Sequence, residues 1–373
     1  MPGMLQAVVS QLKRSRTLLR MAILPAALLF TACSTPLPPP SVKTAPIRVP
    51  RESTQPPQPL PSVLTQEQVT LRSLAGLQER LYRVAAPLLV NNPALCKGNA
   101  RNLLGFTAKN KYSYTDEFMD AAQKTLGLNE HLQVTGVLAG SGAARVGVRP
   151  GDKLVTVEDK PLPQGRNAER QAVAILAPLV SGRTSVTLAV LRNDAEVSMN
   201  VPLTLACAFA IELGNADHVN AYADGLRVMV TRGMLNFTAN DEELAYVLAR
   251  GMAHNVLKHP TKQHMNATIG GVIDNLIRMH PDLSIMIGAA GIKPVTPELD
   301  VAADKLALYM VASAGYNIDN ALPFWQRLAS QFPANVLNSY TALHPATAAR
   351  VSTIERTVLD IKLKQAEKRP LVP

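Results

Sequence analysis

The sequence has few aromatic residues and few cysteines. Aromatic residues make up 4% of the 373 residues, and no run of Lys and Arg is interleaved with them. Protein surfaces that bind nucleic acids combine clustered basic side chains with aromatic ones. We therefore expect no nucleic-acid partner, although the formal net charge is +10. The apolar content of 47% is sufficient for buried cores, and the length suggests two folded domains with extensions.

The N-terminus carries the features of an export signal. Four basic residues and no acidic one lie between residues 13 and 20, and the apolar run Met21–Ala32 and then Cys33 follow. A run of this length is too short to cross a bilayer as a mature helix. The letters LFTAC that end at Cys33 resemble the lipobox of bacterial lipoproteins, in which the cysteine becomes the lipidated first residue. Residues 1–33 are thus predicted to be a lipoprotein signal, and an ordinary cleaved signal with an incidental cysteine is the alternative.

Residues 34–64 are predicted to be a tether. The segment contains ten prolines and almost no apolar periodicity, so it is expected to stay extended and to span up to ~90 Å. Ser34, directly after the cysteine, resembles the class of lipoproteins sent to the outer membrane. We therefore expect a periplasm-facing protein held at the outer membrane by a lipid anchor.

Two cysteines, Cys96 and Cys207, remain once the lipidated one is set aside. An even pair in an oxidising compartment favours a disulfide. Two buried free thiols are the alternative, because the sequence does not show how closely the two backbones approach.

A helical extension is predicted ahead of the first domain, over residues 65–111. Gln66 to Val90 is rich in helix formers, with leucines at helical spacing, and is predicted to be a helix that packs on the body of the protein. Residues 91–111 are predicted to be a loop.

Short apolar runs separated by turns characterise residues 112–205. Four runs are predicted to be strands, with the sequences LQVTGVLA, DKLVTVEDK, SVTLAVLRN and EVSMNVPLTLA, and residues 164–179 are predicted to be a helix. The segment GSGAARVGVRPGDKLVTVEDKPL resembles the bacterial type of PDZ domain. The resemblance implies binding of extended chain ends by strand addition, with Leu126, Gly127 and Leu128 as the loop whose amides capture the carboxylate. A PDZ fold that serves only as a spacer is the alternative.

Residues 206–373 are predicted to be a mainly helical domain with a small β part. The acidic first turn and apolar spacing from Glu242 to Pro260 predict a helix with Asn240 or Asp241 as N-cap. The order NAYADG, LRVMVT, NDEELAYVLARGMAHNVLKH, DVAAD, AGY and LHP resembles the M48 family of zinc metallopeptidases, in particular exported members with a PDZ domain ahead of the peptidase domain. The resemblance implies that LRVMVT is the cleft edge on which substrate is laid as an added strand.

The residues that carry catalysis in that family are degenerate here. The family binds zinc through both histidines of HExxH and a glutamate on a later helix, and the HExxH glutamate is the general base. These positions hold Arg250 for the first histidine, Gly251 for the base, His254 for the second histidine and Asp300 for the third ligand, with Asp304 as the supporting aspartate. Arginine has no lone pair with which to bind a metal ion, and glycine has no carboxylate to accept a proton.

We expect no catalytic metal at this site. Arg250 stays protonated and is expected to form a salt bridge with an aspartate of the later helix, which leaves His254 as a core histidine. His259 lies about 140° further round the helix, so those two histidines are not expected to form a common ligating face. A zinc site made by His254, Asp300 and His344 is the alternative, and weak adventitious metal binding is a third outcome.

The sequence therefore predicts an α+β protein in which a small β-rich PDZ domain precedes a mainly helical, zincin-like M48 domain. We expect a lipoprotein of the envelope that has lost its catalysis, needs no cofactor and binds peptide or protein clients. One alternative is a residually active zinc metalloendopeptidase that uses His254 with substitute ligands. The other is a structural scaffold that binds no peptide.

Overall fold

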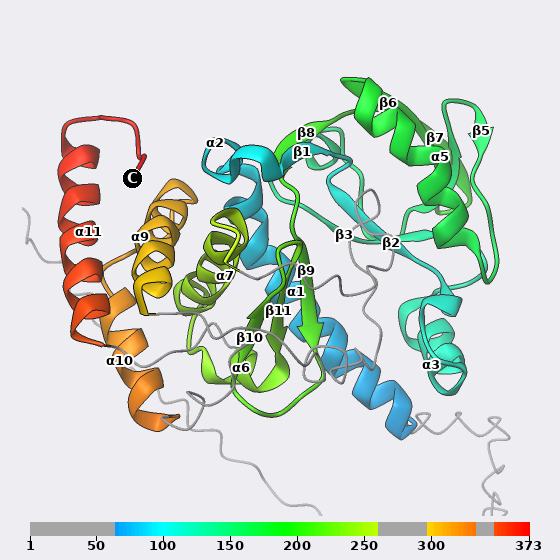
Figure 1. Cartoon of the computed structure of the whole chain (residues 1–373). Coiled ribbons are helices and arrows are strands. Elements are labelled where there is room, and N and C mark those ends of the chain that lie inside the picture. The colour runs from blue at the N-terminus through cyan, green and yellow to red at the C-terminus, as the bar shows by residue number, and fades with distance from the viewer. Residues whose placement is uncertain (1–63, 260–296, 333–346) are drawn as a thin grey trace, which may run out of the picture. The chain divides into compact units, whose positions relative to one another are not determined.

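A computed structural model of the chain describes residues 64–259, 297–332 and 347–373 (Figure 1). The chain divides into the units Met1–Leu60 and Pro61–Pro373, and the described residues all belong to the second. The predicted export signal with Cys33, the predicted tether up to residue 63, and His344 lie outside the described residues. No helix in the described ranges is long and apolar enough to cross a membrane.

The long helix α1 (Gln66–Val90) has the bounds that the sequence predicted. Thr65 caps its start, because the Thr65 hydroxyl accepts the Gln68 N–H and the Gln68 side chain accepts the Thr65 N–H. Its leucines face inward, and Leu81 and Val84 are completely buried. The helix contacts α7 and β9, so it belongs to the larger of the two hydrophobic cores.

The segment after α1 is not the predicted loop. It contains four short elements: α2 (Pro93–Cys96), the 3-10 turn η1 (Lys97–Asn99), β1 (Ala100–Leu103) and β2 (Phe106–Lys109). Strand β1 pairs antiparallel with β8 (Thr204–Cys207), about a hundred residues later, and β2 pairs with β3. The loop prediction failed because these strands are too short to show a period and their partners lie far along the chain.

Cys96 and Cys207 form a disulfide, with their Cα atoms 5.6 Å apart. Cys96 ends α2 and Cys207 ends β8, and the antiparallel pairing of β1 with β8 brings the two elements together. Both cysteines are completely buried in the larger core.

A six-stranded antiparallel sheet occupies the right-hand side of Figure 1. Its order is β2-β3-β4-β6-β7, with β5 paired to β4. The elements of this part are β3 (Gln133–Val137), β4 (Lys153–Val157), β5 (Lys160–Pro161), β6 (Ser185–Arg192), β7 (Ala195–Pro202), η2 (Lys111–Ser113), α3 (Asp116–Leu126), α4 (Gly142–Arg145) and α5 (Ala168–Gly182). The predicted strands and helix are present, but the sheet begins at β2, before residue 112. The last predicted run divides between β7 and β8, which lie in different sheets.

Strands β6 and β7 form a long hairpin. The turn residues Asn193 and Asp194 both have positive φ, 48° and 61°, which is the conformation of a two-residue turn that matches strand twist. Asn and Asp tolerate this region better than most residues. The strands pair from Ser185 with Pro202 to Arg192 with Ala195, without a register shift.

A second, three-stranded sheet has the order β10-β11-β9. Its strands are β9 (Ala210–Gly214), β10 (Ala221–Ala223) and β11 (Arg227–Thr231). The strand predicted from LRVMVT is present as β11, but its predicted place at the cleft edge is wrong. It pairs antiparallel with β10 and parallel with β9, so its backbone groups are used on both sides. The edges of this sheet are β10 and β9.

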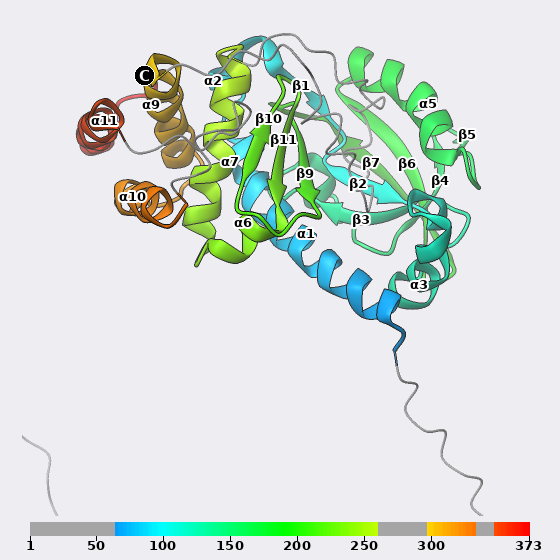
Figure 2. The same cartoon turned by 60° about the horizontal axis from the view of Figure 1, so that its bottom comes forward.

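Helices surround the second sheet. They are α6 (Arg232–Phe237), α7 (Asp241–Val256), α9 (Pro297–Ser313), α10 (Ala321–Gln331) and α11 (Ala348–Ala366). Helix α7 packs on β10 and β11, α1 passes along β9, and α9 separates α7 from α11 (Figure 2). This arrangement places the middle of α7 between the sheet and α9, where the candidate site lies.

Candidate functional site: a buried ion-pair cluster

Helix α7 is buried along almost its whole length, from Glu243 to Val256. Asn240, one of the two predicted caps, accepts the N–H of Glu243 at 2.9 Å. The acidic residues of the first turn interact favourably with the positive end of the helix dipole. The helix ends at Val256, four residues before the predicted end at Pro260.

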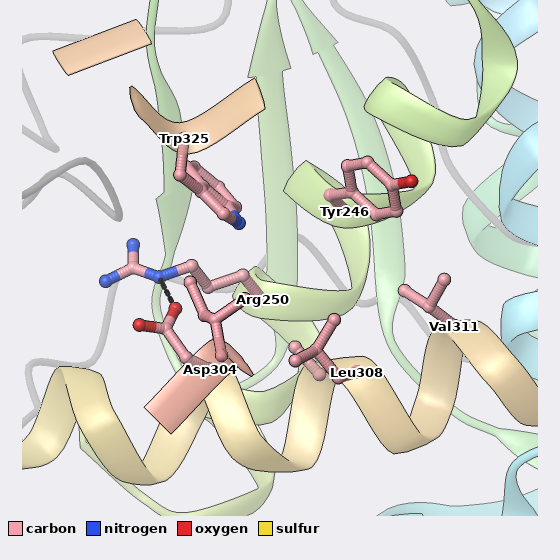
Figure 3. Close-up of a pocket in the computed structure, with 8 residues that line it drawn as sticks. Tyr246, Arg250, Asp304, Leu308, Val311 and Trp325 are labelled. Atoms are coloured by element: carbon pink, nitrogen blue, oxygen red, sulfur yellow. Dashed lines mark hydrogen bonds and ion pairs between the residues drawn. The ribbon is translucent and has the colours of Figure 1, made fainter. Parts of the chain in front are cut away.

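Arg250 lies in the middle of α7 with none of its side chain exposed. Its Nε donates to Asp304 Oδ1 at 2.9 Å, and its Nη2 donates to Asp300 Oδ1 at 2.6 Å. Both aspartates lie in α9 and are themselves buried, so the salt bridge expected from the sequence is present with both partners. Figure 3 shows the contact of Arg250 with Asp304. Arg250 Nη1 is buried and has no hydrogen-bond partner among the described residues.

Arg350 completes the cluster from α11. Its Nε donates to Asp304 Oδ2 at 2.6 Å and its Nη2 donates to Asp304 Oδ1 at 3.0 Å, so one carboxylate joins two guanidinium groups. The ring of Trp325 in α10 lies 5.4 Å from each guanidinium carbon. Arg350 follows the LHP motif and is one of the residues that carry the M48 resemblance, but the sequence predicted no role for it or for Trp325, because the local pattern does not show that α10 and α11 reach this place.

The charges of the cluster balance, with two guanidinium groups and two carboxylates. Burial lowers the pKa of the Arg250 guanidinium, as does the charge of Arg350, while Asp304 and Asp300 raise it. Burial also lowers the pKa of Arg350, but Asp304 and Asp300 outweigh that effect and raise it. Arginine starts from a pKa above 12, so both groups stay charged at neutral pH. Replacement of one arginine would leave a buried negative charge uncompensated.

The residues of this cluster do not fit a catalytic zinc ion. Zinc needs three protein ligands with lone pairs directed at one point, and a protonated guanidinium offers only donors. The carboxylate of Asp300 is bound to Arg250 and lies 3.6 Å from His254 Nε2. Within the described ranges, no three His, Cys, Asp or Glu side chains are grouped so as to hold a metal ion. The proposed third ligand of the alternative site, His344, lies outside the described residues.

Gly251 has no room for a side chain. A Cβ built on it would lie 2.6 Å from Cγ1 and 3.1 Å from Cγ2 of Val228, a buried residue of the central strand β11. Val228 has a β-branched side chain with little freedom at χ1. Helix α7 therefore approaches the sheet more closely than a glutamate at this position permits.

His254 and His259 lie closer together than a straight helix allows, and the expectation that they point apart is wrong. Lys258 has a φ of 58°, and its N–H bonds to the carbonyl of Asn255 while the His259 N–H bonds to the carbonyl of His254. These two bonds are the Schellman arrangement that closes a helix. The chain turns back there, and the two Nδ1 atoms lie 3.0 Å apart.

A small cavity borders the cluster on its apolar side. Trp325, Tyr246, Leu308 and Val311 line it together with the aliphatic part of Arg250 (Figure 3). Its titratable groups are already engaged, since Arg250 is ion-paired and the Tyr246 hydroxyl donates to the carbonyl of Asn317 at 2.6 Å. Burial raises the pKa of Tyr246. The cavity thus offers a reacting molecule no available acid or base.

The predicted carboxylate-capturing loop lies at the end of α3. Leu126 ends α3, and Gly127 caps that helix with a φ of 69°. The Gly127 N–H bonds to the carbonyl of Gln123, and the Leu128 N–H bonds to the carbonyl of Ala122. These amides are therefore bonded to the end of α3, and the assignment of residues 126–128 to carboxylate binding stays a prediction.

Comparison with known families gives a match in the second half of the chain. The profile of peptidase family M48 matches residues 188–358. Two curated relatives are the mitochondrial metalloendopeptidases OMA1 of Saccharomyces cerevisiae, 23% identical over 141 residues, and of Arabidopsis thaliana, 28% identical over 142 residues. These alignments cover 35% and 36% of this chain, and 41% and 29% of the relatives, so well over half of each relative has no counterpart in the match.

Solved structures give a weaker likeness. An HtrA-type protease, AlgW with a decapeptide, has a TM-score of 0.21 at 28% identity and covers 28% of this chain and 30% of its own. The HtrA3 PDZ domain bound to a phage-derived ligand also has a TM-score of 0.21, at 18% identity, and covers 28% of this chain and 88% of its own. Scores of this size carry no argument about this chain. The M48 match, in contrast, includes α7 with Arg250 and His254 and α9 with both aspartates. Residues 188–358, called the M48 region below, are therefore similar to peptidase family M48.

Proposed function

We propose that this protein is a metallopeptidase homologue that has lost its metal chemistry and acts by binding peptide or protein clients in the envelope. The observation that carries the proposal is the Arg250 guanidinium, which takes the position of a zinc-binding histidine and is paired with Asp300 and Asp304. The donor set cannot hold a catalytic ion, and Gly251 supplies no general base. Loss of the base alone costs ~10²–10⁴ in rate, and here the ligand is lost as well.

Binding does not require the lost groups. A client in an extended conformation adds to a sheet edge through backbone hydrogen bonds, and side-chain pockets set its specificity. Among the described residues of the M48 region, β10 lies at an edge of the three-stranded sheet and supports such pairing. The PDZ-like sequence of the six-stranded sheet supports the same mode of binding. Client binding, unlike the residual metalloendopeptidase, thus needs neither metal nor base.

Metal content provides the direct test. The chain is purified without chelator, and its zinc is measured by inductively coupled plasma mass spectrometry. We expect no stoichiometric zinc and no difference between the wild type and His254→Ala. The matched control is His131→Ala, since His131 lies outside the M48 region. One equivalent of zinc per chain that is lost only in His254→Ala, together with cleavage of a peptide library, would establish the residual metalloendopeptidase instead.

Client binding is tested separately with a peptide array. Each peptide is printed with a free and with an amidated C-terminus, and binding is measured with and without chelator. We expect binding that the chelator does not change, with a preference for free C-termini if PDZ recognition contributes. An array without any binding peptide would refute the client-binding role and favour a scaffold.

The place of the protein in the envelope rests on the lipobox-like segment. We propose that Cys33 is lipidated and holds the chain at the outer membrane. Cys33→Ser is expected to move the protein from the membrane fraction to the soluble periplasmic fraction. If the variant stayed in the membrane fraction, the lipid anchor at this residue would be wrong.

A further inference from the structure

The two outer strands of the six-stranded sheet differ in their exposure. Strand β2 is buried along its whole length, so its outer edge is covered. Strand β7 pairs with β6 alone among the described residues, and Ala195, Glu196, Ser198 and Asn200 are exposed. An eight-residue edge with free backbone groups is a template for pairing with another strand.

Two hydrogen bonds determine which backbone groups of β7 point outward. The Leu203 N–H bonds to the Thr184 carbonyl, so the pair just beyond Ser185 and Pro202 is a hydrogen-bonded one. Pairs alternate in an antiparallel ladder, so residues 197, 199 and 201 bond to β6 and residues 196, 198 and 200 face away. The carbonyl of Thr187, which lies opposite Asn200, accepts the Glu158 N–H on the side of β6 away from β7. Thr187 and Asn200 are therefore not a hydrogen-bonded pair, which agrees with this alternation.

The backbone groups of β7 that face away from β6 can pair with a second copy of the same strand. A two-fold axis at Ser198 places Ser198 opposite its own copy and Glu196 opposite Asn200 of the second chain. Each of these three pairs then exchanges two backbone hydrogen bonds, and a carboxylate lies beside a side-chain amide that donates to it. No like charges face each other. Isologous pairing of this kind is the common geometry of homodimers.

The other face of the strand is complementary in the same register. Val197 and Met199 are partly buried and pack on the smaller core. The same axis places Val197 opposite Met199 of the second chain, so apolar side chains continue across the junction. Polar residues thus meet polar ones on the solvent face, and apolar residues meet apolar ones on the core face. A shift by one residue would reverse this match.

From this register we propose that β7 is a homodimer interface, in which two chains pair antiparallel about Ser198 to form one continuous sheet. Pro202, at the end of β7, is not available for pairing, because its carbonyl packs against Gly142 of α4. The pairing is therefore limited to residues 196–200. The interface uses a part of the chain that the proposed loss of metal chemistry does not involve.

The test uses charge at the two-fold axis. The mass of the full chain is measured by light scattering during size-exclusion chromatography. We expect the wild type to show twice the monomer mass, and Ser198→Lys and Ser198→Asp each to show the monomer mass, because like charges then face each other. A mixture of the two variants is expected to regain the dimer mass. Ser198→Thr is the matched control and is expected to remain dimeric.

A cysteine at the axis provides a second measurement. In a chain with Cys33→Ser, Ser198→Cys places two thiols in a directly opposed pair, where Cα atoms lie about 5.5 Å apart, within the range of a disulfide. We expect a covalent dimer on oxidation. Glu196→Cys, which faces Asn200, is the control and is expected to give none.

A wild type that shows the monomer mass at every soluble concentration would overturn the proposal. It would also fail if the charge variants kept the dimer mass, since another surface would then join the chains. If the wild type is monomeric and the charge variants lose binding of a peptide, the edge belongs to a client strand and not to a second copy.

Discussion

Gly251 provides the sharpest test of how helix α7 is packed. We consider Gly251→Ala, which adds a single Cβ. In the middle of a helix this change stabilises by up to ~1 kcal/mol through intrinsic propensity. Here the added atom lies 2.6 Å from Val228 Cγ1 and 3.1 Å from Cγ2, whereas carbon atoms in contact lie about 3.5–4.0 Å apart.

The clash is expected to exceed the gain in propensity. Val228 is completely buried and belongs to β11, which is hydrogen-bonded on both sides, so the strand cannot move without disturbing two ladders. Overpacking of a core costs roughly 1–3 kcal/mol. We therefore expect Gly251→Ala to lower the free energy of unfolding by ~1–2 kcal/mol, and Gly251→Glu to lower it further.

Urea denaturation measures these free energies. Gly76→Ala in α1 is the matched control, because a Cβ there meets no atom within 4 Å and is expected to stabilise the chain. Val228→Ala destabilises by itself but removes both clashing carbons, so the double variant should show a favourable coupling of ~1–3 kcal/mol. If Gly251→Ala stabilises as Gly76→Ala does, the contact relaxes without cost and the packing argument is refuted.

Three further predictions concern other buried groups, and urea denaturation measures each. Burial lowers the pKa of Lys109 from 10.5 to about 8, so the unfolded chain binds more protons between these values and the stability of the wild type rises with pH in that window. Lys109→Met should therefore raise the free energy of unfolding below pH 8 by up to ~3 kcal/mol, and this difference from the wild type should shrink towards pH 10.5. A difference that does not change with pH would contradict the prediction. Replacing both Cys96 and Cys207 with serine removes a crosslink across a sequence separation of 111 and should lower the free energy of unfolding by ~3–5 kcal/mol. An unchanged urea midpoint would show that the disulfide does not restrict the unfolded chain. Arg250→Ala leaves the charge of Asp300 buried and should cost ~3–5 kcal/mol, while a neutral effect would place the carboxylate in contact with water.

Sequence reasoning worked best where a single local pattern determines the outcome. The bounds of α1 follow from two local features. The leucines repeat along one face of the helix, and the reciprocal cap at Thr65 lies at its start. The ion pairs of Arg250 were predictable because the resemblance to the M48 motifs places Arg250 of α7 opposite Asp300 and Asp304 of α9. A buried guanidinium at that position has few possible partners other than these two aspartates.

The failures share a different cause. The place of a strand within a sheet depends on neighbours that a local pattern does not specify, so β11 was read as an edge although β9 and β10 lie on both sides of it. The role of Leu126–Leu128 stays a prediction, because a left-handed Gly127 fits the end of a helix as well as a binding loop. His259 was placed by continuing an ideal helix, and the turn at Lys258 redirected it.

Arg250 and Gly251 have distinct physical consequences that reinforce each other. The Arg250 guanidinium is a covalently attached cation beside the carboxylates of α9, so these are compensated, and Asp304 joins α7, α9 and α11. Gly251 lets α7 lie close to β11, where a Cβ would meet Val228. Substituting either residue alone meets an environment shaped by the other, since a histidine at 250 removes the ion pairs of Arg250 with Asp300 and Asp304 while Asp304 stays paired with Arg350, and a glutamate at 251 collides with Val228. The ion pairs of Arg250 and the close packing at Gly251 thus hold α7 between β11 and α9 through side chains of the protein itself.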